Sequence, residues 1–393
     1  MQIAYTRLQK REVQKLKQIP ECFATTPIVY AVEKNYQIMV PVACETLMWV
    51  EVGGECFYDD VNGILRSNCT THRMIVPMER LDTAGEYKIC YRIVNERKPY
   101  YSDVSEMFEY SSAFYPVKEE GARFFHIADA HNNVEKPVAA AKAFGESDFL
   151  ILNGDLPDHS GDIKNFTTIH RIAAEITNGE KPVVFSRGNH DMRGIYAENI
   201  AEHTPTDNGR SYYTFRLGSI WGMVLDCGED KPDDHVEYGH TICCEDFRKR
   251  QTVFIKDVIA RAEQEYEAEG VTNRLIVCHA PFSERNKPPF DIEEETYAEW
   301  CRLLRLYVKP DIMICGHVHR AYVTNVGDEG DYLGQSCPVV VGSEIQKNKD
   351  DLHGEKLYVM TGIEIGNDNF FVVFQGSDGK VYNSLNLDNS TED

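Results

Sequence analysis

The sequence of 393 residues has no uninterrupted apolar run of about 18 residues or more, the length that a helix needs to cross a bilayer. Residues 1–20 carry several basic side chains, but no apolar segment follows them as it would in a secretory signal. Neither a membrane span nor a signal peptide is therefore expected, and the cytoplasm is the predicted location.

Positive charge is also in short supply. The chain has 41 Lys and Arg against 63 Asp and Glu, which gives a formal net charge of -22. A field of this sign repels nucleic-acid backbones and anionic lipid headgroups unless a local patch or a bound cation reverses it. Nucleic acids and membranes are therefore not the expected partners.

Cysteine is present, but without the spacing of a metal or disulfide motif. The 12 cysteines are spread over a long chain, none forms a CxxC pair, and the only adjacent pair is Cys243 and Cys244. In a reducing compartment such residues behave as small apolar side chains. We predict free, mostly buried thiols and assign them no chemistry.

Two sequence textures divide the chain. From residue 28 to 115, short β-rich runs alternate with turns, one of them at residues 82–85, and none has a helical period; this is typical of an antiparallel β-sandwich. From residue 123 on, apolar runs alternate with helical stretches, which indicates an α/β core. We predict an N-terminal segment and β-sandwich over residues 1–118 and a second domain over residues 119–393, whose last runs add strands to the core.

Four stretches of the second domain have the spacing of amphipathic helices: residues 137–144, 162–177, 245–267 and 292–307. Residues 227–244 are rich in Asp, Glu, His and Gly, and we predict a loop there. The loop could form a substrate-facing rim, although an acidic run is more often simply solvated.

Five apolar strands of the second domain end in polar groups. These groups contain Asp129 and His131, Asp155 and Asp158, Asn189 and His190, His279, and His317 and His319. Because ligands bind beyond the carboxyl ends of strands in an α/β sheet, the five groups are expected to share one crevice. Burying several carboxylates and imidazoles together is costly unless a cation binds them.

The residue types indicate which cations these would be. Carboxylate and amide oxygens mixed with imidazole nitrogens, without thiolates, suit Mn, Fe, Zn or Mg. The candidate ligands are Asp129, His131, Asp155, Asn189, His279, His317 and His319. They are too many for one ion that must also hold water and substrate, but they suit two divalent ions that share a bridging carboxylate.

Two such ions favour phosphoester hydrolysis. Ions about 3.5–4 Å apart can bind both the attacking and the leaving oxygens of an in-line displacement. They also lower the pKa of a bridging water, which can then attack as hydroxide near neutral pH. The strand ends therefore predict a metal-dependent phosphohydrolase.

In type and order, these groups resemble the signature blocks of the calcineurin-like metallophosphoesterase superfamily, over about residues 123–374. The resemblance implies a four-layer α/β/β/α core of two packed sheets flanked by helices. It also implies that Asp155 bridges the two metals. One metal would be held by Asp129, His131 and His319, and the other by Asn189, His279 and His317.

The resemblance assigns further roles next to the metals. His190 would contact the phosphate and protonate the leaving alkoxide, and Asp158 would orient His190. Arg187, Arg193 and His159 flank the same groups and could bind substrate, but each is at least as readily explained as an ordinary surface or turn residue.

A β-sandwich before such a core is the arrangement of purple acid phosphatases, so the N-terminal part looks similar to a fibronectin-III-like domain. Two positions depart from those enzymes. Asp158 stands where they have an iron-binding tyrosine, and His131 stands where they lack a ligand. We therefore expect a colourless member with ordinary divalent ions, and the acid optimum does not carry over.

The favoured substrate is a small phosphomonoester, with a phosphodiester or a nucleotide left open. A nuclease-type phosphodiesterase is the first alternative, and the charge of -22 argues against it. The second is a non-catalytic binding protein that uses the β-sandwich, although no expected ligand is missing from the sequence. The sequence predicts no oligomeric state.

Overall fold

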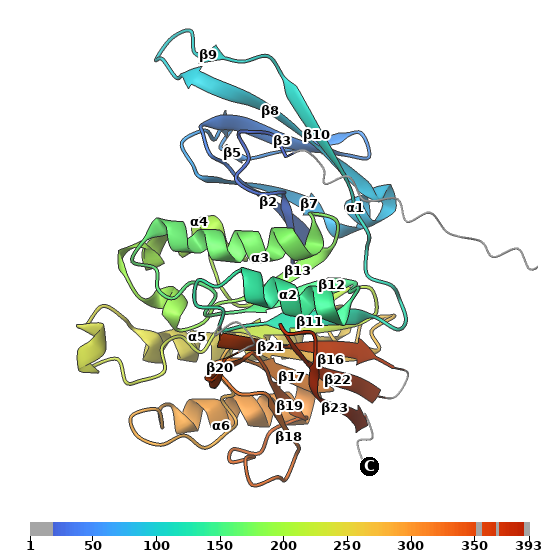
Figure 1. Ribbon diagram of the computed structural model, residues 1–393, viewed down its shortest axis with the longest axis vertical. Coiled ribbons are helices and arrows are strands. Elements are labelled where there is room, and N and C mark those ends of the chain that lie inside the picture. Colours follow the sequence, from blue (N-terminus) through green and yellow to red (C-terminus); the bar gives the residue numbers. More distant parts are fainter. Residues whose placement is uncertain (1–18, 351–355, 367–368, 389–393) are drawn as a thin grey trace, which may run out of the picture.

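The computed structural model describes residues 19–350, 356–366 and 369–388 (Figure 1). The expectation that the chain begins without a signal peptide concerns residues that lie mostly outside these ranges. Among the described residues, none of the helices has the length and apolar character needed to cross a membrane. All 12 cysteines are free, and most are buried, as predicted.

A ten-stranded sheet runs through the whole molecule. Its order is β23-β22-β21-β11-β12-β13-β1-β2-β7, with β20 beside β21. The strands are β1 (Ile28–Val32), β2 (Asn35–Pro41), β7 (Thr71–Pro77), β11 (Arg123–Ile127), β12 (Phe149–Asn153), β13 (Pro182–Ser186), β20 (Glu344–Asp350), β21 (Lys356–Ile365), β22 (Asn369–Gly376) and β23 (Val381–Asp388). Strands β11, β12, β13 and β1 are parallel neighbours, so their carboxyl ends meet at one edge.

A six-stranded sheet packs against the middle of the first. Its order is β14-β15-β16-β17-β19-β18. The strands are β14 (Tyr213–Leu217), β15 (Ile220–Leu225), β16 (Asn273–Cys278), β17 (Ile312–Cys315), β18 (Tyr322–Thr324) and β19 (Val339–Val341). Strands β15, β16, β17 and β19 are parallel to one another.

Helices cover the outer faces of both sheets, which completes the predicted α/β/β/α core. Helices α2 (Glu135–Phe144) and α3 (Thr167–Thr177) pack on the ten-stranded sheet, and α5 (Cys244–Ala260) and α6 (Glu294–Leu303) pack on the other. Successive side chains of β11 point to opposite faces of the sheet and so belong to different layers of the core. Phe124 belongs to the cluster between the sheets, whereas its neighbour Phe125 belongs to the cluster under α2 and α3.

The N-terminal strands form the predicted β-sandwich, but one of its two sheets is part of the core. A five-stranded sheet packs on β1, β2 and β7 through Val50, Ile89, Ile38 and Met74. It contains β3 (Thr46–Val52), β4 (Glu55–Tyr58), β8 (Glu86–Glu96), β9 (Asp103–Val104) and β10 (Phe108–Ala113), next to the small hairpin β5 (Asp60–Val61) and β6 (Ile64–Leu65). Because β1 pairs with β13, the ten-stranded sheet continues across residue 118, where we predicted the domain boundary.

The structure corrects several local predictions. Residues 82–85, predicted as a simple turn, end the short helix α1 (Met78–Ala84), with Gly85 in the left-handed region at φ 64. Helix α5 stops before residue 267. Past its end, the buried Glu265 turns inward to accept hydrogen bonds from Trp221 (3.1 Å) and Thr214 (2.9 Å). These tertiary contacts outweigh local helix propensity.

Shorter helical turns complete the chain. A 3-10 turn (Ile163–Phe166) precedes α3, and a π-type turn (Leu304–Val308) follows α6, so both predicted helices are present with altered ends. The remaining elements are η2 (His190–Met192), η3 (Ile195–Asn199), α4 (Ile200–His203), η4 (Val236–Tyr238) and η5 (Ala262–Gln264). Apart from η4, residues 228–243 form the predicted loop.

Two buried histidines between α3 and α4 make the fold sensitive to acid. His170 Nε2 donates to the carbonyl of His203 (2.8 Å), and burial lowers the pKa of both imidazoles to about 4. Above the unfolded pKa of about 6.5 both states are neutral. As pH falls from there towards 4, the unfolded chain takes up protons that the folded chain excludes, so stability decreases.

We expect each of these histidines to cost about 2 kcal/mol of unfolding free energy at pH 5 relative to pH 7. Urea unfolding with chelator at both pH values measures this loss. In His170→Gln, where the amide can keep the hydrogen bond to residue 203, the loss should be smaller by about that amount. The exposed His240→Gln is the matched control, and an equal loss in both variants would contradict the assignment.

Candidate metal centre

The predicted ligands extend from strand ends of two sheets. Asp129 and His131 follow β11, Asp155 follows β12 and Asn189 follows β13, all in the ten-stranded sheet. The six-stranded sheet contributes the remaining residues, His279 after β16, and His317 and His319 after β17. The single crevice that we predicted thus lies where the carboxyl ends of two packed sheets meet.

Asn153 fastens the two sheets at this edge. Its side-chain amide donates to the carbonyls of Cys278 and Ile314 (both 3.2 Å), which belong to the other sheet. Its backbone carbonyl accepts from His279 Nδ1 (2.6 Å), so the other ring nitrogen of His279 faces the centre. Sequence reasoning missed Asn153, because a polar last residue of a strand carries no sign of its partners.

The backbone at the centre is held in conformations that side chains rarely adopt. Five candidate ligands have left-handed φ values: Asp129 (50), His131 (44), Asp155 (52), His317 (68) and His319 (55). Such conformations cost of order 1–3 kcal/mol each outside Gly, and they cluster at functional sites. Gly188 makes room for this geometry, because a Cβ there would overlap the carboxylate of Asp155.

One group of ligand atoms surrounds the side chain of Asp129. His319 Nε2 lies 3.3 Å from Asp129 Oδ1 and 3.1 Å from His131 Nε2. Potential ligand atoms of all three residues lie within 4.8 Å of one another. These are the three residues that the resemblance to the superfamily assigns to one ion.

A second group lies beside it, around Asp155. Asp155 Oδ2 is 3.2 Å from His279 Nε2, and ligand atoms of Asp155, His279 and His317 again lie within 4.8 Å of one another. Asn189 joins them, with its amide oxygen 3.1 Å from His317 Nδ1. His279 Nε2 is also 3.8 Å from Asp129 Oδ1, so the two groups adjoin.

Buried atoms in both groups have the character of metal ligands. Asp129 Oδ1 and His279 Nε2 are fully buried and have no hydrogen-bond partner. Burial opposes charge on His279, but Asp155 and Asp129 outweigh it and raise the pKa of the imidazole to about 10. The carboxylates thus favour a positive charge strongly at this point, and this donor set fits divalent cations.

Acidic side chains lie beside a ring nitrogen of two of these imidazoles, an arrangement that is usual for metal-binding histidines. His131 Nδ1 faces Asp158 Oδ1 at 3.3 Å, and His317 Nε2 faces Asp230 Oδ2 at 3.8 Å. Burial lowers the pKa of both His131 and His317, which keeps them neutral and able to bind a cation.

Asp230 is a residue whose role sequence reasoning did not assign beyond the loop as a whole. It follows β15, which is parallel to β16, so its loop starts at the same edge of the sheet as His279. Recognising residues 220–225 as a sixth apolar strand would have pointed to it.

His190 lies at the rim of the centre, and Asp158 contacts it through the main chain. Its backbone N–H donates to Asp155 Oδ1 (2.8 Å), and its Nδ1 donates to the backbone carbonyl of Asp158 (2.7 Å). The Asp158 carboxylate is half exposed and faces His131 instead. The side chain of Asp158 therefore supports His131, whereas its main chain orients His190.

The three candidate substrate residues have different surroundings. Arg193 lies beside the centre, with Nη1 3.3 Å from His190 Nε2, and makes a bidentate ion pair with Glu229 (2.8 and 2.9 Å). Arg187 instead pairs with Asp226 (2.8 Å). The exposed His159 accepts a hydrogen bond from Gly161 N–H (3.0 Å) within its own turn, so only Arg193 is placed next to the candidate ligands.

A family model described as calcineurin-like phosphoesterase matches residues 122–321, more than half of the chain. The chain therefore belongs to the calcineurin-like phosphoesterase family, and it is a hydrolase of phosphoester bonds that depends on divalent metal ions. A search of curated proteins finds no match to this sequence.

A purple acid phosphatase is the one of the following three solved structures whose TM-score, above 0.5, shows the same fold. A purple acid phosphatase from yellow lupin (Lupinus luteus) seeds aligns with a TM-score of 0.57 at 13% identity, over 92% of this chain and 74% of that chain. A predicted phosphoesterase from Streptococcus pneumoniae has a TM-score of 0.33 at 13% identity, over 68% of this chain and 98% of that chain. Vacuolar protein sorting 29 from Cryptosporidium parvum has a TM-score of 0.35 at 12% identity, over 68% of this chain and 99% of that chain.

The contact between Asp158 and His131 can be tested by metal titration. We expect Asp158→Asn to weaken metal binding about 10- to 100-fold, because the imidazole of His131 loses the carboxylate beside it. Competition with a chromophoric chelator measures the affinity. Asp162→Asn, in the same loop, is the matched control, and unchanged affinities in Asp158→Asn would refute the role.

Proposed function

We propose that the protein is a two-metal phosphatase acting on a small phosphomonoester, with Mn, Fe, Zn or Mg as the ions. One observation carries the proposal: seven predicted ligands from two sheets adjoin around buried, unpartnered Asp129 Oδ1 and His279 Nε2. Asp129, His131 and His319 would hold one ion, and Asn189, His279 and His317 the other. Asp155 would bridge the two, as the resemblance to the superfamily implies; its Oδ2 lies 3.2 Å from His279 Nε2.

The chain's own groups would position and protonate the substrate. When bound, the ions would supply Lewis acidity to phosphate oxygens and to water. His190 is held through Nδ1 by the Asp158 carbonyl, which leaves Nε2 directed to the side where Arg193 lies. In the imidazolium form, in which both ring nitrogens are protonated, the proton on Nε2 would pass to the leaving alkoxide and leave the ring neutral. Arg193 would face the phosphate, with Glu229 fixing its orientation.

Loss of the bridging carboxylate should remove both ions. We expect Asp155→Asn to lower the content of both metals, because one side chain serves both sites. Elemental analysis of protein reconstituted with Mn after chelation measures this. Asn189→Ala, which removes a ligand of one ion only, is the comparison. If Asp155→Asn loses a single equivalent, the residue does not bridge.

Loss of the proposed acid should affect the rate and leave the metals in place. We expect His190→Ala to reduce kcat about 10²–10⁴-fold, the usual contribution of general acid catalysis. Metal content should match that of the wild-type protein. Aryl esters with better leaving groups should be affected less, because they need less protonation. An equally active variant would exclude His190 from the reaction.

Two other functions remain as hypotheses. A nuclease-type phosphodiesterase would use the same centre, but the net charge of -22 opposes binding of a polyanion. A binding protein that relies on the β-sandwich would not need the buried ligands. Assays of phosphorylated metabolites and of DNA with each of the four metals separate the three functions. The cytoplasmic location and the likeness of the sandwich to fibronectin-III domains stay predictions.

A further inference from the structure

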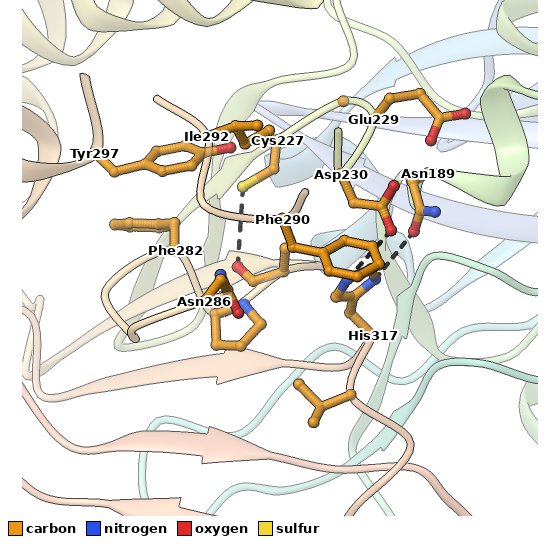
Figure 2. Close-up of a pocket in the computed structure, with 14 residues that line it drawn as sticks. Asn189, Cys227, Glu229, Asp230, Phe282, Asn286, Phe290, Ile292, Tyr297 and His317 are labelled. Atoms are coloured by element: carbon orange, nitrogen blue, oxygen red, sulfur yellow. Dashed lines mark hydrogen bonds and ion pairs between the residues drawn. The ribbon is translucent and has the colours of Figure 1, made fainter. Parts of the chain in front are cut away.

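A pocket of about 210 Å³ opens directly beside the candidate metal centre. Asn189, His317 and Asp230 form one side of it, and apolar residues form the other (Figure 2). Because Asn189 and His317 belong to both, a phosphate bound at the centre would have its alcohol portion next to this space.

The floor of the pocket is formed by buried aromatic side chains. Phe282, from the segment after β16, and Tyr297, from α6, are both buried, and their ring centroids lie 5.7 Å apart in a stacked arrangement. Trp300 supports them from behind, with its centroid 5.4 and 5.3 Å from theirs. The pocket therefore offers a preformed apolar surface that does not depend on a ligand.

Phe290 lines the same pocket and is more exposed than Phe282 and Tyr297. Its side chain is 40% exposed, in the loop that leads to α6. A single exposed aromatic residue is ordinary, but this ring lines a pocket whose other wall is also aromatic. Lys231 Nζ lies 5.1 Å from its ring centroid and also pairs with Asp230 (2.9 Å), which connects the loop to the metal side.

Charge limits what the pocket can bind. Among its described lining residues, none is Lys or Arg, and the only ionisable carboxylates are Glu229 and Asp230. Both are engaged with the cations of Arg193 and Lys231. A second phosphate or carboxylate on the substrate would have to compete with these two acidic groups for the same cations. The alcohol portion that fits is uncharged.

Resting on the proposed phosphatase function, we propose that this pocket binds the alcohol portion of the substrate, and that this portion carries an uncharged planar aromatic ring. Rings prefer offset or edge-to-face contacts with centroids about 4.5–7 Å apart, and the exposed ring of Phe290 offers such a contact beside the buried rings of Phe282 and Tyr297. Asn286 adds an amide on the same side that can hydrogen-bond to ring substituents. Nucleosides and arylalkyl alcohols share this chemistry.

Matched substrates test the preference for a ring. Adenosine 5′-monophosphate and ribose 5-phosphate have the same ester linkage, as do 2-phenylethyl and 2-cyclohexylethyl phosphate, so leaving-group acidity is equal within each pair. We expect kcat/KM to be about tenfold higher for the ester that carries the aromatic ring in at least one pair. The pair that shows the higher kcat/KM for its aromatic ester tells whether the natural alcohol is a nucleoside or an arylalkyl alcohol.

The outcomes separate this inference from the function on which it rests. Hydrolysis of every ester with equal kcat/KM would overturn the aromatic subsite and leave the phosphatase proposal intact. Failure to hydrolyse any ester with any of the four metals would overturn both.

Variants connect the preference to the pocket. Phe290→Ala, at a half-exposed loop position, should reduce the ratio of kcat/KM within the responding pair about tenfold, and Phe290→Tyr should restore it. Tyr101→Ala removes a 96% exposed aromatic ring far away in the sandwich and should keep the wild-type ratio. A ratio in Phe290→Ala equal to that of Tyr101→Ala would exclude the pocket as the source of the preference.

Discussion

The structure depends on bringing buried carboxylates and imidazoles together where two sheets meet. Asp129 and Asp155 lie in the interior beside four candidate histidine ligands, and the carboxylates are strong enough to raise the pKa of His279 to about 10. Ion pairs of this kind are expensive to bury unless every charge is balanced. The left-handed backbone at Asp129, Asp155 and His317 indicates that the fold tolerates local strain to keep this arrangement.

Three of the candidate histidine ligands have a second contact on the side away from the centre. His279 is held by a carbonyl, His131 by Asp158 and His317 by Asp230. The buried Asp191 accepts hydrogen bonds from the N–H groups of Gly188 (2.7 Å) and Asp155 (3.3 Å), which ties the ends of β12 and β13 together. Such contacts let a site keep its geometry while its metals exchange.

The β-sandwich is joined to the core through the backbone. Because β1 pairs with β13, the strand that precedes Asn189, hydrogen bonds of one sheet continue from the sandwich to the candidate centre. Figure 1 shows the sandwich at one end of the molecule and α6 near the other. We infer that the sandwich stabilises the ten-stranded sheet, because removal of the sandwich strands would leave the parallel strand β13 exposed at the edge.

The sequence alone predicts the chemistry of the residues that directly follow the strands. Apolar runs followed by Asp129, Asp155 and His279 predict both the strands and the candidate ligands, because strand length and polarity are local properties. Pairing across sheets is not local. The pairing of β1 with β13, the contact of the Asp158 side chain with His131 and the hydrogen bond of Glu265 with Trp221 beyond the end of α5 all depend on partners far along the chain. Only the packing of the two sheets decides which surfaces meet, and it alone places Phe290 and Tyr297 beside the ligands.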